Sequence, residues 1–204
     1  MSRCAALLLF LTAALAACSS GSGEPAALPP GPDVTSTAAP TSAAPTSAAP
    51  TPSSTSGTRR APIRWVGPAA TGTKAPVQEA TRSYWSMVVR LAEAPDPADP
   101  AIAALSVSPQ REELVTLYGN VERQGLSQRG PIDGAVTVST VTGARATAAT
   151  CLDQSLVRVY DRAGKPRPGS SGSVQLFVVS LSRSGAAWKV SGVADGGACT
   201  LPGG

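Results

Sequence analysis

The chain has 204 residues, with 17 basic and 13 acidic side chains, a formal net charge of +4 and no histidine. The small basic excess is scattered and only 4% of the residues are aromatic, so the composition argues against a nucleic-acid-binding surface. Without histidine the chain also lacks the residue best suited to proton transfer near neutral pH and a common zinc ligand. We therefore expect no metal, no cofactor and no histidine-assisted catalysis.

The first eighteen residues have the features of an export signal. Arg3 precedes an apolar run over residues 5–14, and Leu15-Ala16-Ala17-Cys18 follows it. These last four residues resemble a bacterial lipobox. The resemblance implies that residues 1–17 are a signal peptide that is removed and that the thiol of Cys18 is diacylated, which anchors the protein on the extracytoplasmic face of the cell membrane. The alternative is an ordinary secretory signal with an incidental cysteine.

The composition also bears on the source and on the kind of anchor. Alanine, glycine and proline are abundant and arginine outnumbers lysine, which is typical of a GC-rich genome. Together with the lipobox, this bias indicates an actinobacterium. No later apolar stretch approaches the twenty or so residues that span a bilayer, so the lipid on Cys18 is the only membrane anchor that we expect.

Residues 18–60 are predicted to be a disordered tether. The part over residues 29–58 consists almost entirely of Pro, Ala, Ser and Thr, and the five letters TSAAP occur twice in succession over residues 41–50. Such a sequence cannot bury enough apolar surface to offset its chain entropy. Its prolines favour extended polyproline II at about 3.1 Å per residue, so the tether could span on the order of 100 Å. A neutral low-complexity insertion is the alternative interpretation.

The rest of the chain, residues 61–204, is long enough for one domain, and helices are predicted first. Apolar residues recur at helical spacing over residues 76–94: Val77, Ala80, Tyr84, Met87, Val88 and Leu91. Pro76 suits the first turn, and the prolines from Pro95 onward end the helix. A short helical turn over residues 101–105 follows. A second clear helix begins at Pro109 and stops at Gly125.

After Gly130 the pattern changes to short strands separated by turn residues. The predicted strands cover residues 136–141, 145–152, 156–160, 174–181 and 188–193. Residues 161–172 are expected to form a long exposed connection. Residues 174–179 are apolar on both faces, which places their strand near the centre of the sheet.

Two cysteines remain after the signal peptide and the lipid-bearing Cys18, namely Cys151 and Cys199. In an exported protein, which folds in an oxidising compartment, such a pair predicts a disulfide. Closing this loop stabilises the fold by roughly 4 kcal/mol in the chain-entropy model. The bond is expected to pin the C-terminal tail onto the sheet; two buried free thiols are the alternative.

Helices followed by a run of strands indicate an α+β fold. This order, with Tyr84-Trp85 in the first helix and Trp188-Lys189-Val190 in the last strand, resembles the nuclear transport factor 2-like fold, also called cystatin-like. Over roughly residues 76–195, the resemblance implies N-terminal helices packed on a curved antiparallel sheet that forms a cone. It implies that the cone is lined by Tyr84, Val88, Asp153, Phe177 and Trp188. The family places short strands before its last long helix, and only residues 106–108 leave room for one.

Enzymes of this fold use Asp, His or Tyr inside the cone, and the candidates here are few. Asp153 is an acid in an apolar strand context and could act as a general base if burial raised its pKa. The preferred interpretation is that it accepts hydrogen bonds at a strand end. Tyr84, Tyr118 and Tyr160 could donate to an oxyanion, but tyrosines at such positions usually belong to the core. Trp65 either fastens the preceding segment to the core or is a lone exposed aromatic residue.

The predicted strand over residues 145–152 contributes small side chains to the cone. Its alanines, with Ala144, favour a modest apolar cavity over a closed core. Three functions remain open: a non-catalytic, lipid-anchored module that binds a small apolar ligand or a cell-envelope protein, an accessory domain of a cell-wall or transport complex, and an isomerase or dehydratase that uses Asp153. The first is favoured, because one plausible acid and no histidine suit binding without transformation.

Overall fold

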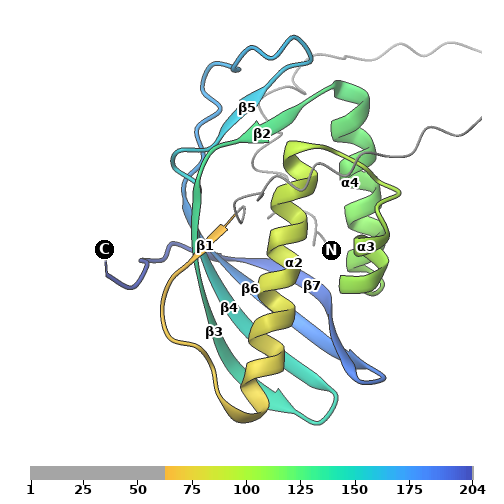
Figure 1. Ribbon diagram of the computed structural model, residues 1–204, viewed down its shortest axis with the longest axis vertical. Helices are drawn as coiled ribbons and strands as arrows, with labels where there is room; N and C mark the ends of the chain where they lie inside the picture. The colour runs from red at the N-terminus through yellow and green to blue at the C-terminus, as the bar shows by residue number, and fades with distance from the viewer. Residues whose placement is uncertain (1–62, 204) are drawn as a thin grey trace, which may run out of the picture. The chain divides into compact units, whose positions relative to one another are not determined.

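A curved sheet wraps around a long helix in the computed structural model, which describes residues 63–203 (Figure 1). The predicted signal peptide, Cys18 and the predicted tether lie outside these residues. Among the described residues, no helix has both the length and the apolar character needed to cross a membrane.

The predicted helices are present with nearly the predicted bounds. They are α2 (Ala75–Glu93), α3 (Pro100–Leu105) and α4 (Gln110–Gln124), and a 3-10 turn, η2 (Gly72–Lys74), precedes α2. Pro76 lies in the first turn of α2, where its missing N–H costs no hydrogen bond. Asp99 caps α3, since its side chain accepts from the backbone N–H of Ala101 at 2.8 Å. Gly125 ends α4 in the left-handed conformation, with φ 64°.

Residues 63–203 form seven strands, arranged in two sheets. The strands are β1 (Ile63–Trp65), β2 (Ser127–Arg129), β3 (Ile132–Thr142), β4 (Arg145–Asp153), β5 (Arg158–Tyr160), β6 (Val174–Ser184) and β7 (Ala187–Gly197). The larger sheet has the order β1-β3-β4-β6-β7, and β2 pairs with β5 separately. The strand expected over residues 156–160 is therefore present in shortened form, but it belongs to the second sheet. The apolar strand β6 lies next to the central strand β4, as predicted.

The larger sheet is mixed, whereas the sequence led us to expect an antiparallel one. Strands β3, β4, β6 and β7 are antiparallel neighbours, but β1 pairs in parallel with β3. The chain leaves β1, passes through all the helices and returns to β3, and such a crossover brings the second strand in parallel. Between the helices, Ser106 forms a single parallel bridge to Val190, at the place where the sequence left room for one short strand.

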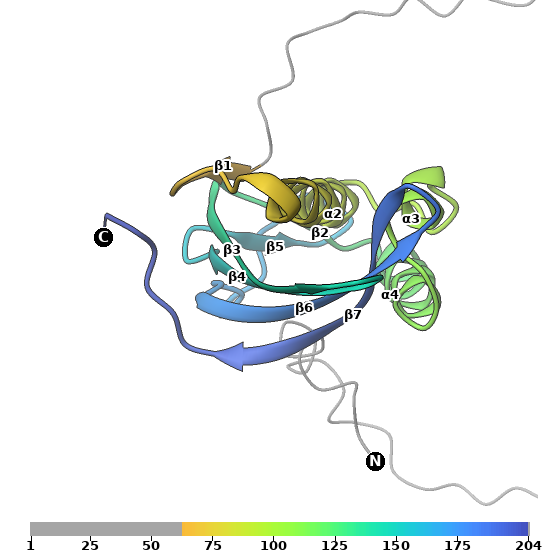
Figure 2. The same cartoon turned by 90° about the horizontal axis from the view of Figure 1, so that it is seen from below.

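Helix α2 packs against the concave face of the sheet, with α3 and α4 to one side (Figure 2). The side chains inside this cone form one core in which Tyr84, Ala148 and Thr150 are fully buried and Phe177 is 3% exposed. The Trp85 ring contacts Phe177, with 4.8 Å between ring centroids. The predicted apolar cavity is therefore absent around these residues. Tyr84 and Trp85 of α2 and Phe177 of β6 are buried inside the cone.

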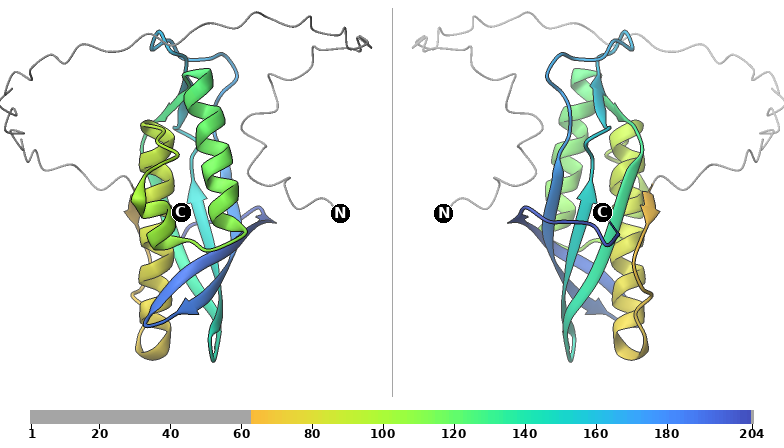
Figure 3. Two further views of the ribbon diagram at one scale, coloured as in Figure 1. Left: turned by 90° about the vertical axis from the view of Figure 1, so that its right-hand side faces the viewer. Right: turned by 90° about the vertical axis from the view of Figure 1, so that its left-hand side faces the viewer.

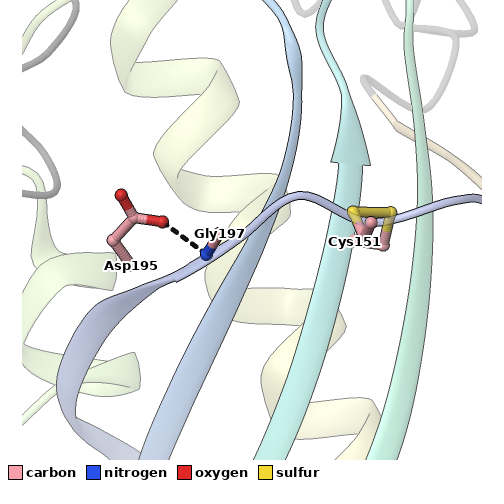
Figure 4. Close-up of a disulfide and its surroundings, with 4 residues drawn as sticks. Cys151, Asp195 and Gly197 are labelled. Carbon is pink, nitrogen blue, oxygen red and sulfur yellow. Dashed lines mark hydrogen bonds between the residues drawn. A yellow bond between two sulfur atoms is a disulfide. The ribbon is translucent and has the colours of Figure 1, made fainter.

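The predicted disulfide between Cys151 and Cys199 is present, with 6.0 Å between the Cα atoms. Cys151 pairs with Leu176 in β6, and Leu176 pairs with Gly197 at the end of β7. The C-terminal tail thus runs back from the edge strand over β6 to β4, across the outer face of the sheet (Figures 3 and 4). This confirms that the bond pins the tail onto the sheet.

Candidate functional site

The structure brings most of the predicted cone residues together. Tyr84, Phe177 and Trp188 belong to one buried core, and the half-buried Val88 packs against it. Asp153 does not join them. Thr150 and Leu152 point into the core, and side chains alternate along a strand, so Cys151 and Asp153 lie on the outer face.

Asp153 therefore does not line the cone, which corrects that part of the prediction. It lies at the end of β4, and its carboxylate accepts a hydrogen bond from the backbone N–H of Ser155 at 2.9 Å. This is the strand-end arrangement that the sequence analysis preferred over a general base.

The two tyrosines inside the fold hold their protons firmly. Burial raises the pKa of Tyr84 well above its ordinary value, and the negative charges that ionised Tyr118 and Glu113 would carry raise it further. Burial also raises the pKa of Tyr118, although Arg90 opposes this shift. The Tyr118 hydroxyl donates to the backbone carbonyl of Val88 at 2.8 Å, whereas the Tyr84 hydroxyl has no partner among the described residues. These groups are neutral, enclosed parts of the core.

A groove lies outside the cone, along the side of α2 that faces away from the sheet. It has a volume of about 500 Å³ and is lined by Trp65 of β1, by Glu79, Arg82, Ser83, Ser86, Met87 and Arg90 of α2, and by Ala101 and Leu105 of α3. Figure 2 shows α2 between β1 and α3, which are the two elements that flank this groove. We call it the α2 groove.

Arg82 and Trp65 form one side of the α2 groove. The guanidinium carbon of Arg82 lies 5.7 Å from the centroid of the Trp65 ring, a cation–π arrangement. Trp65 packs closely over Gly134, where an added Cβ would come within 2.7 Å of the ring. Trp65 thus fastens the start of the domain to the core, which was one of the two interpretations of its sequence position.

Of the two arginines that line the α2 groove, one has a carboxylate partner and the other has none within residues 63–203. Arg90 donates to Asp99 at 2.5 Å, and this hydrogen bond lowers the pKa of the Asp99 carboxyl and raises that of Arg90. Arg82 makes no salt bridge within residues 63–203, and its buried Nε has no hydrogen-bond partner there. Glu79 is the acid in the groove, and its carboxylate accepts from the Ser83 hydroxyl at 3.4 Å. Arg82 is therefore the cation of the groove that a ligand can neutralise.

The sequence analysis missed this groove. Residues 79, 82, 83, 86 and 90 form a polar stripe at helical spacing, opposite the apolar face on which the helix was predicted. That stripe was visible in the sequence, but its walls come from β1 and α3. Within residues 63–203 no group of His, Cys, Asp and Glu is arranged to hold a metal ion. The α2 groove offers a cation, hydroxyl groups and apolar surface, which are the means of binding a ligand.

No family model matches the sequence, and no curated protein matches it. Among solved structures, the intermembrane-space region of the chloroplast protein ARC6 is 14% identical, covers 62% of this chain and 98% of its own, and gives a TM-score of 0.45. A protein from Kribbella flavida is 12% identical, with coverages of 63% and 93% and a TM-score of 0.43.

A third solved structure is a domain of unknown function with a cystatin-like fold from Nostoc punctiforme. It is 14% identical, with coverages of 64% and 82% and a TM-score of 0.40.

Proposed function

We propose that the protein is a lipid-anchored module on the extracytoplasmic face of the cell membrane that binds a ligand without transforming it. The observation that carries this proposal is the filled cone. Enzymes of the fold that it resembles work inside the cone, and here Tyr84, Thr150 and Ala148 are fully buried there. Asp153, the acid considered for catalysis, lies on the opposite face of the sheet. These positions favour binding over catalysis.

The α2 groove supports the binding role. The groove has a volume of about 500 Å³ and is largely open to solvent. It combines apolar walls with a few polar groups, as small-molecule sites do. The ligand-binding surface in this proposal is therefore the outer side of α2 and not the interior of the cone.

The location rests on two features of the chain. The disulfide between Cys151 and Cys199 favours an oxidising compartment outside the cytoplasm. The sequence around Cys18 supports attachment through a lipid. Metabolic labelling with a clickable palmitate analogue tests the anchor: we expect label on the wild type and on Cys4→Ala, and none on Cys18→Ala. Equal absence of label from all three would refute the anchor.

The binding role needs its own test. Native mass spectrometry of the exported protein, extracted in mild detergent, should detect a bound small molecule. Ser86→Trp, which fills the α2 groove, should remove it. Ser184→Trp, at the exposed end of β6, is the matched control and should retain it. A wild-type protein without any bound mass, or a mass that Ser86→Trp retains, would contradict the proposal that this groove is the binding surface.

A further inference from the structure

We infer that the α2 groove binds a carboxylate carried on an apolar body, and that Arg82 receives the carboxylate. This inference rests on the proposed binding role and adds the chemical class of the ligand. The charges of the groove, the orientation of Arg82 and the apolar lining support it.

The first argument is charge complementarity. Arg90 is already neutralised by Asp99, whereas Arg82 has no carboxylate partner within residues 63–203. A half-buried guanidinium without a counter-ion is less stable than one with a partner, because it has lost part of its hydration. A carboxylate that enters the groove supplies the missing partner.

The second argument is the orientation of the guanidinium. A cation–π contact places the Arg82 guanidinium over the Trp65 ring, and Gly134 packs closely behind that ring. This contact orients the guanidinium before a ligand binds. Its planar fork of donors matches the two oxygens of a carboxylate. Lysine at this position would supply the charge without the fork.

Glu79 limits the number of negative charges that the groove can accept. It lines the same groove, although it forms no salt bridge with Arg82. A ligand with one negative charge can pair with Arg82 and lie away from Glu79. A phosphate dianion or a polyphosphate would place a second negative charge near Glu79, where like charges repel. The groove therefore favours a monoanion.

The remaining walls account for the apolar body. Met87, Ala101 and Leu105 lie along the groove and pack against the core of the domain. Met87 is 3% exposed, so the partly exposed Ala101 and Leu105 supply most of the apolar surface that a ligand can contact. Two kinds of molecule share this chemistry: the C-terminus of a peptide that ends in apolar residues, and a free fatty acid.

Titration of the full mature chain with defined probes tests the inference. The probes are N-acetyl-leucyl-leucine with a free carboxylate, the same dipeptide as its amide, and octanoate. Isothermal titration calorimetry gives the affinity, and fluorescence gives a second readout. Of the three tryptophans, Trp85 and Trp188 are 3% and 8% exposed, so the partly exposed Trp65 should dominate any ligand-dependent change.

We expect one or both carboxylates to bind and the amide to bind at least about tenfold more weakly. Arg82→Gln should weaken carboxylate binding at least about tenfold. Arg82→Lys should fall between it and the wild type, because it keeps the charge and loses the planar fork. Arg145→Gln removes an exposed arginine at the hairpin between β3 and β4 and should bind like the wild type. Circular dichroism checks that each variant is folded. If Arg82→Gln does not fold, the weaker carboxylate binding of Arg82→Lys still tests the role of the guanidinium.

Binding of the dipeptide alone identifies a peptide C-terminus, and binding of octanoate alone identifies a fatty acid. Equal binding of acid and amide, or unchanged binding by Arg82→Gln, would overturn the inference. If neither carboxylate binds but native mass spectrometry shows a mass that Ser86→Trp removes, the inference fails and the proposed function stands. If there is no such mass either, both fail.

Discussion

Replacing Gly134 with alanine tests the packing on which one wall of the α2 groove depends. A Cβ at this position would lie 2.7 Å from Cζ3 of Trp65 and 3.0 Å from Cδ2 of Leu152. Carbon atoms in favourable contact are about 3.5–4.0 Å apart, so both contacts are too short. Leu152 is fully buried and has no room to move. Trp65 must therefore shift, and the stacked Arg82 loses its support.

Overpacking of this kind costs about 1–3 kcal/mol. For a domain of this size, that loss lowers the melting temperature by roughly 3–12 °C. Thermal unfolding followed by circular dichroism measures it, and the variant should also bind carboxylates more weakly. The matched control is Gly192→Ala in β7, where an added Cβ meets no atom within 4 Å. This control should unfold at or slightly above the wild-type temperature. Equal melting temperatures for the two variants would refute the close packing of Trp65 on Gly134.

Three further predictions concern the rest of the domain. Replacing both Cys151 and Cys199 with serine should lower the free energy of unfolding by roughly 4 kcal/mol in urea titrations, and a loss below about 1 kcal/mol would contradict the entropic argument. Tyr84→Phe should leave stability at pH 7 unchanged or raise it by about 1 kcal/mol, because it removes a buried hydroxyl without a partner. Burial raises the pKa of Tyr84 in the folded protein above its ordinary value of 10.0. The protonated hydroxyl therefore contributes fully to the free energy of unfolding below pH 10, and this contribution is lost as the pH rises further. Tyr84→Phe should therefore resist alkaline unfolding better than the wild type, and an identical pH profile would argue against this. Asp153→Asn should leave carboxylate binding unchanged and should change the free energy of unfolding by no more than about 0.5 kcal/mol, because the side-chain oxygen of asparagine still accepts from the backbone N–H of Ser155. A marked loss of activity or binding would point back to a catalytic role.

The helices were predictable because their signals are local. The apolar period of α2, Pro76 in its first turn and Gly125 after α4 each act within one or two helical turns. Strands β1 and β2 were missed, because three residues are too few to show an alternating pattern. The parallel pairing of β1 with β3 depends on the whole intervening chain, and no local pattern carries that information.

The site was predictable only in part, for a similar reason. Tyr84 and Phe177 were placed in the core correctly, since large apolar residues on a predicted face are usually buried. The small residues of β4 led to the prediction of a cavity. The size of a side chain on one strand does not show what packs opposite it, and here aromatic residues of α2 and β6 are buried inside the cone. Asp153 was wrongly placed in the cone, although strand alternation puts it on the same face as Cys151. The α2 groove needs β1 and α3 to lie beside the polar stripe of α2, and that juxtaposition is tertiary.

The place where the chain enters the domain has a mechanical consequence. Any tension along the chain that precedes Ile63 acts first on β1, an edge strand aligned with β3 over three residue pairs. The ion pair between Arg64 and Asp133 joins the same two strands and resists their separation. If β1 is peeled away, Trp65 leaves with it, and Arg82 loses the surface on which it stacks. The strand through which a load enters the domain also carries a wall of the groove. We therefore expect that pulling on the chain lowers the affinity of the groove for the proposed ligand, and that a bound ligand strengthens the attachment of β1.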